Sequence, residues 1–282
     1  MKEKKAYPDI GELGWSLYLS AHLRWLREKA DSSLAVITSP DRKCLYKDSA
    51  SLIFDIPADF YCRFKGERNC FGLHPPAAKE IRAYFERLLP FGYSIPANFS
   101  FGCNRRFLAD KVIYRPYEYS RIIEGKKRIL VFPRYRVHEA FSFRNLPEWF
   151  YIGLVDALCD EFPDYEIKTI GISSGTYNID MGDNHSNYVN GVVESVDLQD
   201  VIDEFQMAIA TVGGASSLPK ISVLQSVPTF IVGHERKRCT KDENWMGVKM
   251  GFYEVAKDSY GNFDFKDCTS KILDFVKEVM NE

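Results

Sequence analysis

The stretch that most constrains the fold is 196–233, which has the pattern of a helix, a strand, a turn, a second helix and a second strand. Asp197 precedes apolar residues spaced four apart, so an amphipathic helix is expected there. The apolar run 208–212 predicts a buried strand, and 227–232 predicts the next one. Two strands joined through a helix are typical of a parallel crossover unit.

A turn of small residues separates the first of these strands from the second helix. It comprises Gly213, Gly214, Ala215, Ser216 and Ser217, and Pro219 stands where the first turn of the helix would begin. In an open parallel sheet, ligands bind outside the carboxyl ends of the strands, and a helix N-terminus favours an anion. We therefore expect a phosphate site here. A tight turn without a ligand is the plainer alternative.

The same alternation of strands and helices runs through most of the chain and indicates an α/β protein. Further helices are expected at 11–29, 77–89, 147–160 and 267–280, and further strands at 34–38, 51–56, 128–133 and 165–171. The tract 177–191 is polar and rich in Asn, Asp and Gly, so a loop is expected there. Because Glu124-Gly-Lys-Lys reads as a linker, we expect two domains, 1–125 and 126–282, with 267–282 as a terminal helix that packs back on the first domain.

The composition is that of an ordinary globular protein. The net charge of −2 argues against a protein that coats nucleic acid or membranes over its whole surface. Seven scattered cysteines favour reduced thiols over a disulfide framework. No signal peptide or transmembrane run is evident, so a cytoplasmic protein is expected, with peripheral attachment to a membrane left open.

An irregular basic and aromatic region interrupts the alternation over 57–125. Across 57–128, fourteen Lys and Arg residues stand against seven Asp and Glu residues. Basic side chains among Tyr and Phe favour an anionic acceptor, either a phosphorylated glycan, a lipid-linked group or a nucleic-acid strand. A solvated surface, with long side chains lying over aromatic rings, explains the pattern equally well.

Two residues of the first predicted helical segment have candidate roles. Glu12 lies in the glycine turn before the helix, where a carboxylate can take a proton from an acceptor hydroxyl. The alternative is a simple helix cap. His22 lies within the helix and is expected to be a packed or surface histidine.

No metal site is predicted. Asp180, Asp183, Asn184 and His185 cluster in one loop but lack the spacing of an EF-hand. The spacing of Cys62, Cys70, His74 and Cys103 matches no standard zinc pattern.

Three segments resemble motifs of the GT-B glycosyltransferases, and most of all those of the ADP-heptose:lipopolysaccharide heptosyltransferase family. Gly11-Glu12 and the following helix correspond to a Gly-Asp turn with Leu-x-x-Leu. Phe132-Pro133-Arg134 and Arg144-Asn145-Leu146-Pro147 resemble a strand ending in Pro-Gly and a later Lys-x-Trp-Pro. The third segment runs from Gly213 to Lys220 and ends in Ser226-Val227-Pro228, resembling Gly-x-Asp-Thr-Gly-x-x-His and a helix ending in Gly-Val-Pro.

The resemblance implies two Rossmann-like domains that face each other across a cleft. It implies a glycosyltransferase that moves a sugar from a nucleotide-diphosphate donor to a hydroxyl acceptor, with Glu12 as general base and with no metal or other cofactor. On the acceptor side we place Gly11, Trp15, Arg105 and Arg106. Donor contacts are expected from Arg134, Arg144, Gly213, Gly214, Ser216, Ser217 and Lys220.

The sequence departs from the family motif at two positions. Ala215 stands where the family has Asp, and Lys220 stands where it has His. These changes support an alternative, a nucleotide-sugar-binding module with altered catalysis. A nucleotide-sugar epimerase or hydrolase is a further alternative, and it needs another acid or histidine, for which His138 and His185 are the candidates.

Overall fold

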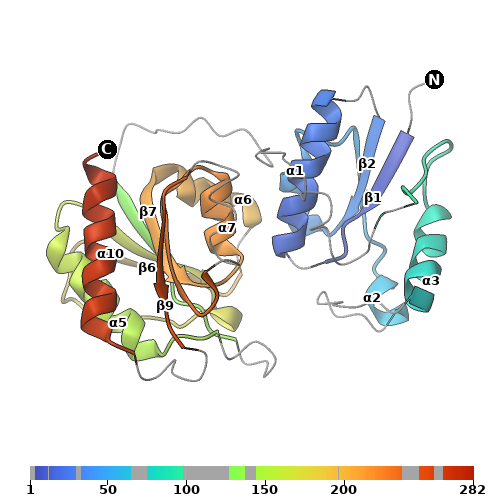
Figure 1. The fold of residues 1–282 in the computed structure, drawn as a ribbon. Helices are drawn as coiled ribbons and strands as arrows, with labels where there is room; N and C mark the ends of the chain where they lie inside the picture. Colours follow the sequence, from blue (N-terminus) through green and yellow to red (C-terminus); the bar gives the residue numbers. More distant parts are fainter. Residues whose placement is uncertain are drawn as a thin grey trace. The chain divides into compact units, whose positions relative to one another are not determined.

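The computed structural model describes residues 4–11, 13–29, 33–64, 75–97, 99, 127–136, 144–195, 197–236, 248–256 and 263–282. The chain divides into two compact units, Met1–Glu118 and Tyr119–Glu282. Each unit contains a parallel β-sheet with helices beside it (Figure 1), which confirms the predicted α/β class. The boundary predicted at residue 125 lies outside the described residues.

The first unit contains a three-stranded parallel sheet in the order β1-β2-β3. Helix α1 (Leu13–Lys29), which was predicted, returns the chain from the carboxyl end of β1 to the start of β2. The first strand was not predicted, because it opens with two lysines and only its last three residues are buried. The remaining bounds are β1 (Lys4–Pro8), β2 (Ser33–Thr38), η1 (Pro40–Tyr46), β3 (Leu52–Asp55), α2 (Phe60–Arg63) and α3 (Pro75–Glu86).

His22 is a packed histidine, as the sequence suggested. Its ring lies 5.7 Å from the Trp25 ring and 6.2 Å from the Tyr7 ring, centroid to centroid. Burial lowers the pKa of His22 to about 4, and the charge of Lys5 acts in the same direction. The imidazole is therefore neutral at physiological pH.

The second unit contains a six-stranded parallel sheet in the order β6-β5-β4-β7-β8-β9. Its strands are β4 (Arg128–Phe132), β5 (Glu166–Ile172), β6 (Tyr188–Val193), β7 (Ala208–Gly214), β8 (Thr229–Gly233) and β9 (Met250–Glu254). The helices among its described residues are α5 (Glu148–Glu161), α6 (Leu198–Glu204), α7 (Leu218–Leu224) and α10 (Phe265–Met280), with the 3-10 turns η3 (Ser173–Gly175) and η4 (Phe205–Met207). The prediction of a loop over 177–191 was wrong at its end, where β6 begins, and β9 was not predicted.

Helices α5 and α10 cover one face of this sheet, and α6 and α7 lie on the other (Figure 1). Helix α10 contacts α5, β7 and β9. Its apolar stripe, with Ile272, Phe275 and Val276, belongs to the core of the second unit. The apolar face of α5 lies beside this stripe in the same core.

Three buried hydroxyl groups connect β7, α7 and β8. The Thr211 Oγ1 lies 2.7 Å from the Ser222 Oγ and 3.0 Å from the Thr229 Oγ1, and the last two atoms are 2.7 Å apart. All three residues are fully buried. Each hydroxyl can donate one hydrogen bond and accept another, so the triangle satisfies groups that would otherwise be costly to bury.

The end of α7 depends on a left-handed residue. Ser226 has φ 62°, and it precedes the Val227-Pro228 that leads into β8. Helices commonly end on such a residue, and glycine is preferred there because a Cβ is strained.

In the described part of the chain, no helix has the length and apolar character needed to cross a bilayer.

The buried imidazole makes stability depend on pH. Between the ordinary pKa of 6.5 and the folded value of about 4, the unfolded chain binds a proton that the folded chain does not. The free energy of unfolding is therefore expected to fall by about 2–3 kcal/mol as the pH drops from 7 to 4 on account of His22 alone. Urea unfolding of the wild type and of His22→Phe across this range measures the difference, and parallel pH profiles would contradict it.

The strained helix end gives a second stability prediction. Ser226→Gly is expected to raise the free energy of unfolding by about 0.5–1 kcal/mol. Glycine relieves the strain of the left-handed conformation, and this gain is partly offset because glycine loses more backbone entropy on folding than serine does. Ser226→Val serves as the opposite control and is expected to lower it by about 1 kcal/mol or more. Urea denaturation tests both variants; destabilisation by glycine would show that the hydroxyl matters more than the strain.

Candidate functional site

The carboxyl ends of β4 and β7 form the topological switch point of the second sheet. From β4 the chain builds outward through β5 and β6, and then returns to the opposite side of β4 with β7. Phe132, the last residue of β4, is paired with Gly213 of β7. In open α/β sheets the crevice for ligands lies at this place. The turn predicted to hold an anion follows directly.

Gly213 is required by the close approach of these two strands. A Cβ at this position would lie 2.7 Å from the Phe132 Cβ and 2.9 Å from the Phe132 carbonyl oxygen. Contacts this short are not tolerated between rigid backbone groups. The glycine therefore sets how closely β7 runs beside β4 where the two strands end.

Gly214 brings the segment before α5 to the same turn. A Cβ at this position would lie 3.1 Å from the Tyr151 Oη, 3.7 Å from the Arg144 carbonyl oxygen and 3.7 Å from a methyl carbon of Leu146. Two motifs that are some 70 residues apart in the sequence are thus neighbours at the switch point. The structure places the backbone of Arg144 beside the glycine turn.

Arg134 anchors the same segment. It is 7% exposed, and its Nη1 donates a hydrogen bond to the Asn145 Oδ1 at 2.5 Å. The Asn145 amide also bonds the backbone of Arg136 in both directions, at 2.9 and 3.0 Å. The almost buried guanidinium thus connects Arg134 to Asn145, the residue that follows Arg144.

The turn after β7 carries the remaining predicted donor contacts. Ser216, Ser217 and Lys220 are each partly exposed. The Ser216 Oγ accepts a hydrogen bond from the Leu218 N–H at 3.3 Å, and Ser217 occupies the N-cap position of α7 without a side-chain cap bond. Hydroxyl groups and first-turn N–H groups therefore gather where α7 begins.

Tyr151 is a component of this site that the sequence analysis missed. Its side chain is fully buried, and its hydroxyl faces the backbone of Arg134 and Gly214. Burial raises the pKa of Tyr151 far above its ordinary value, against the opposing charge of Arg134. Within an apolar stretch, Trp149-Phe150-Tyr151 reads as helix core, so only its position one turn into α5 hinted at the site.

In the first unit, the structure describes only part of the predicted acceptor side. Glu12, Arg105 and Arg106 lie outside the described residues. Gly11 is buried, and a Cβ there would lie 3.2 Å from the Trp15 ring and 3.3 Å from its Cβ. Trp15 is 8% exposed, so it packs under the glycine turn.

A buried polar cluster holds this glycine turn, and sequence reasoning did not find it. The fully buried carboxylate of Asp9 accepts hydrogen bonds from Ser16 at 3.0 Å, Thr38 at 3.0 Å and Tyr46 at 2.7 Å. Arg42 lies 3.9 Å from the same carboxylate and donates to the Gly11 carbonyl. Burial raises the pKa of Asp9, while Arg42 and the hydroxyl donors oppose that shift.

Of the two histidines considered for an epimerase or hydrolase, His185 lies away from the glycine turn. His185 precedes β6 and therefore lies at the amino-terminal edge of the sheet, opposite the switch point. Its Nε2 lies 2.8 Å from Asp156 and its Nδ1 3.8 Å from Asp160, both on α5. His138 lies outside the described residues. Among the residues that the structure describes, no cluster of His, Cys, Asp and Glu suits a metal ion.

Comparison with known proteins rests on solved structures, since neither a family model nor a curated protein matches the chain. E. coli heptosyltransferase WaaC with ADP aligns with a TM-score of 0.60 and 9% identity, over 96% of this chain and 99% of that one. E. coli ADP-heptose LPS heptosyltransferase II aligns with a TM-score of 0.61 and 11% identity, over 99% of both chains. A family 9 glycosyl transferase from Veillonella parvula aligns with a TM-score of 0.62 and 12% identity, over 98% of this chain and 97% of that one.

These likenesses extend over nearly the whole chain and confirm the predicted fold resemblance. The protein has the GT-B-like α/β architecture, with two parallel sheets, of these glycosyltransferases. At 9–12% identity the comparison shows the fold alone.

The contact between β4 and β7 gives a testable prediction. Gly213→Ala is expected to destabilise the protein by about 1–3 kcal/mol, because the new methyl group must push Phe132 backbone atoms aside. Gly233→Ala is the matched control, since a Cβ at that buried strand end would lie 3.6–3.8 Å from Ala215 and Phe252, in ordinary contact. Urea unfolding compares the two, and equal effects would show that the close approach is not limiting.

Proposed function

We propose that this protein is a glycosyltransferase that moves a sugar from a nucleoside-diphosphate donor to a hydroxyl acceptor. The observation that carries the proposal is the meeting of Arg144, Gly213 and Gly214 at the switch point of the second sheet. The two glycines let β4 and the segment before α5 pack closely against this turn. Cations beside a turn at the carboxyl ends of the strands suit a diphosphate. The likeness of the fold to sugar-transferring enzymes supports the same reading.

Donor binding is assigned to the second unit. Arg144 and Lys220, both partly exposed, would neutralise the diphosphate as it leaves, and Ser216 and Ser217 would donate hydrogen bonds to its oxygens. Arg134 would act through Asn145 by fixing the Arg144 segment. Because protein cations and N–H groups supply this stabilisation, the reaction as proposed needs no metal ion.

The acceptor is assigned to the first unit, with Glu12 as general base. Its carboxylate would take the proton from the acceptor hydroxyl while the new C–O bond forms at the anomeric carbon. The bond from that carbon to the diphosphate oxygen breaks, and the nucleoside diphosphate leaves with its electron pair. Gly11 and Trp15 would shape the turn, and Arg105 and Arg106 would attract an anionic acceptor.

The altered motif supports a second candidate function. Ala215 and Lys220 replace the Asp and His of the heptosyltransferase motif, so a module that binds a nucleotide sugar without transferring it is the alternative. The two candidates share the donor site and differ in turnover. An epimerase or hydrolase is less favoured, because His185 lies at the opposite edge of the sheet.

Donor binding is tested by thermal unfolding with a panel of nucleoside diphosphates and their sugars. ADP comes first, because the WaaC structure was solved with ADP. A true ligand at about 100 times its dissociation constant adds roughly 2.7 kcal/mol of stability. Lys220→Met and Arg144→Met are each expected to weaken binding about tenfold or more, since each removes a charge-assisted contact. Lys271→Met on α10 is the matched control; equal losses there would contradict the site.

Transfer is tested with the donor that this screen identifies. Glu12→Gln is expected to lower turnover by about 10²-fold or more while donor affinity stays within error, as removal of a general base predicts. Glu28→Gln, near the other end of α1, is the control and should keep full turnover. Chelation with EDTA should leave the rate unchanged. Donor binding without any turnover in the wild type would favour the binding module.

A further inference from the structure

The loop that follows α3 presents large apolar side chains to solvent. Phe91 is 99% exposed and Leu88 is 48% exposed, with Pro90 between them. An isolated surface leucine needs no explanation, but a phenylalanine in full contact with water beside a second apolar side chain suggests a surface that meets a partner.

The backbone of this loop holds Phe91 in its exposed place. The Tyr93 N–H donates to the Pro90 carbonyl at 3.1 Å, and Gly92 has φ 86°, so Phe91 occupies the second position of a tight turn. The Tyr93 hydroxyl lies 2.7 Å from the Ser33 Oγ, and the Lys4 Nζ lies 5.6 Å from the centre of the Tyr93 ring. The exposure of Phe91 is thus built into an anchored turn.

This turn lies at the amino-terminal edge of the first sheet. Ser33 and Lys4 are the first residues of β2 and β1, and Ser94 bridges to Lys5. Gly11, one of the predicted acceptor residues, follows the carboxyl end of β1, so the turn and Gly11 are on opposite edges of the sheet. The apolar loop is therefore not part of the site described above.

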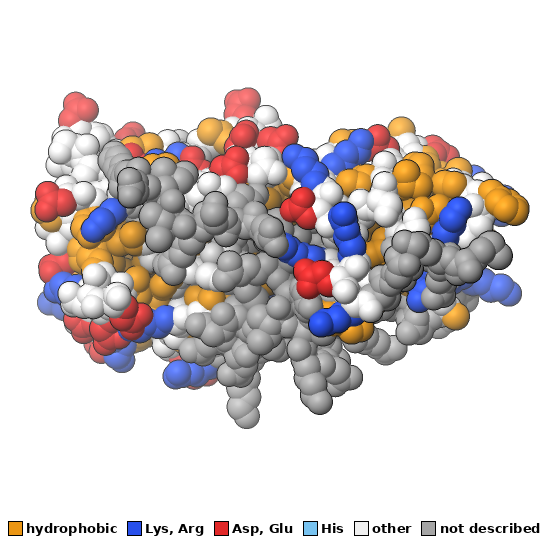
Figure 2. Space-filling view, turned by 90° about the horizontal axis from the view of Figure 1, so that it is seen from above, with side chains coloured by type: hydrophobic (Ala, Val, Ile, Leu, Met, Phe, Trp, Pro, Cys, Tyr) orange, Lys and Arg blue, Asp and Glu red, His pale blue; other side chains and the backbone are white. Residues whose placement is uncertain are grey.

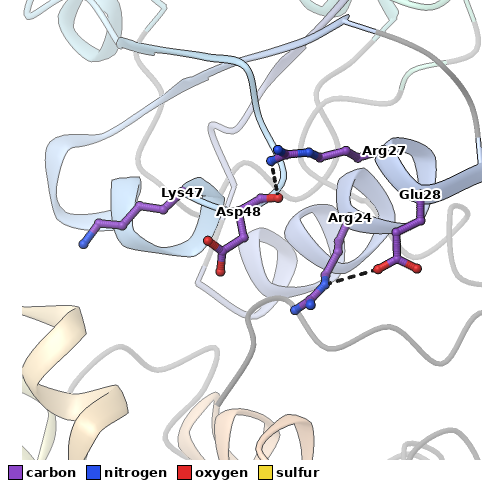
Figure 3. A pocket seen from close by; sticks show the side chains of 5 residues that line it. All are labelled: Arg24, Arg27, Glu28, Lys47 and Asp48. Atoms are coloured by element: carbon purple, nitrogen blue, oxygen red, sulfur yellow. Dashed lines mark hydrogen bonds and ion pairs between the residues drawn. The ribbon is translucent and has the colours of Figure 1, made fainter. Parts of the chain in front are cut away.

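The same edge carries an excess of positive charge. Among the described residues there, six cations stand against three acids: Lys4, Arg24, Arg27, Lys29, Lys47 and Arg87 against Glu28, Asp48 and Glu86. Five of these nine line a shallow pocket of about 460 Å³ (Figure 3). Arg24 pairs with Glu28 at 3.6 Å, and Arg27 donates to the Asp48 carbonyl at 2.5 Å, while Lys47 extends away from both acids.

We propose that this edge binds an anionic membrane surface, with Phe91 and Leu88 entering the lipid interface and the cations facing headgroup phosphates. Figure 2 shows apolar and basic side chains next to each other on the face of this unit that it presents. Aromatic side chains favour the bilayer interface, and basic residues near an anionic leaflet add attraction. A single apolar anchor binds weakly, so the combination of two signals is what reversible attachment requires.

Charge also favours a membrane over a second copy of the chain as the partner. A symmetric dimer through this edge would set the two cationic excesses against each other. An anionic lipid surface neutralises the same charges. The proposal does not depend on the transferase activity, and its test uses neither donor nor acceptor.

Vesicle flotation of the full chain tests this proposal. The protein is expected to float with vesicles of equal parts phosphatidylcholine and phosphatidylglycerol, to float poorly with phosphatidylcholine alone, and to be released by salt. Phe91→Ser is expected to weaken binding about tenfold or more, and Phe91→Leu is expected to retain it, because the interface selects for apolar area. The double variant Lys29→Gln, Lys47→Gln should lose about tenfold, while Lys79→Gln on α3 serves as the control.

Three results would overturn the proposal. The first is equal vesicle binding by the wild type and Phe91→Ser, and the second is no binding to the anionic vesicles at all. The third comes from sedimentation velocity without lipid: a wild-type dimer that Phe91→Ser converts to monomers would assign the face to a second copy of the chain. Since Phe91 makes almost no buried contact, the variants are expected to fold normally.

Discussion

The second unit is organised around the close approach of β4 and β7 at Phe132 and Gly213. With a side chain at Gly213 the two strand ends could not lie this near, and the turn that follows would move away from α5. Instead Gly214 lies against Tyr151 and the carbonyl of Arg144, so two distant motifs share one place. The candidate donor site is therefore a consequence of backbone packing, with the polar side chains added to it.

Buried polar groups fix the elements next to both candidate regions. Around Asp9, hydroxyl donors from α1, β2 and η1 converge on one carboxylate, and Arg42 extends the cluster to the Gly11 carbonyl. In the second unit, Thr211, Ser222 and Thr229 join β7, α7 and β8 in a closed triangle. Such networks specify one arrangement, because a partial rearrangement leaves a buried group without a partner.

Much of this architecture was predictable from sequence, because buried strands and amphipathic helices leave periodic patterns. The crossover unit around the small-residue turn was predicted with its strand pairing. Three strands were not predicted. Strand β1 opens with lysines, β6 is a half-exposed edge strand, and β9 is a short edge strand with no fully buried residue. The Asp9 cluster also escaped, since its partners lie 7 to 37 residues away and no local pattern links them. Tyr151 was not predicted as a site residue, because its apolar neighbours in the sequence indicate a helix core.

Taken together, the proposed lipid-binding loop at Phe91 and the proposed acceptor turn at Gly11, on opposite edges of the sheet, would restrict how an acceptor is presented. Helix α1 spans the first unit from one sheet edge to the other, and its 17 residues correspond to about 25 Å. With the Phe91 loop seated in a bilayer, the glycine turn stands off from the headgroups by about that length. A hydroxyl on the lipid itself would then be out of range, whereas a long oligosaccharide stalk or a freely diffusing alcohol would reach it.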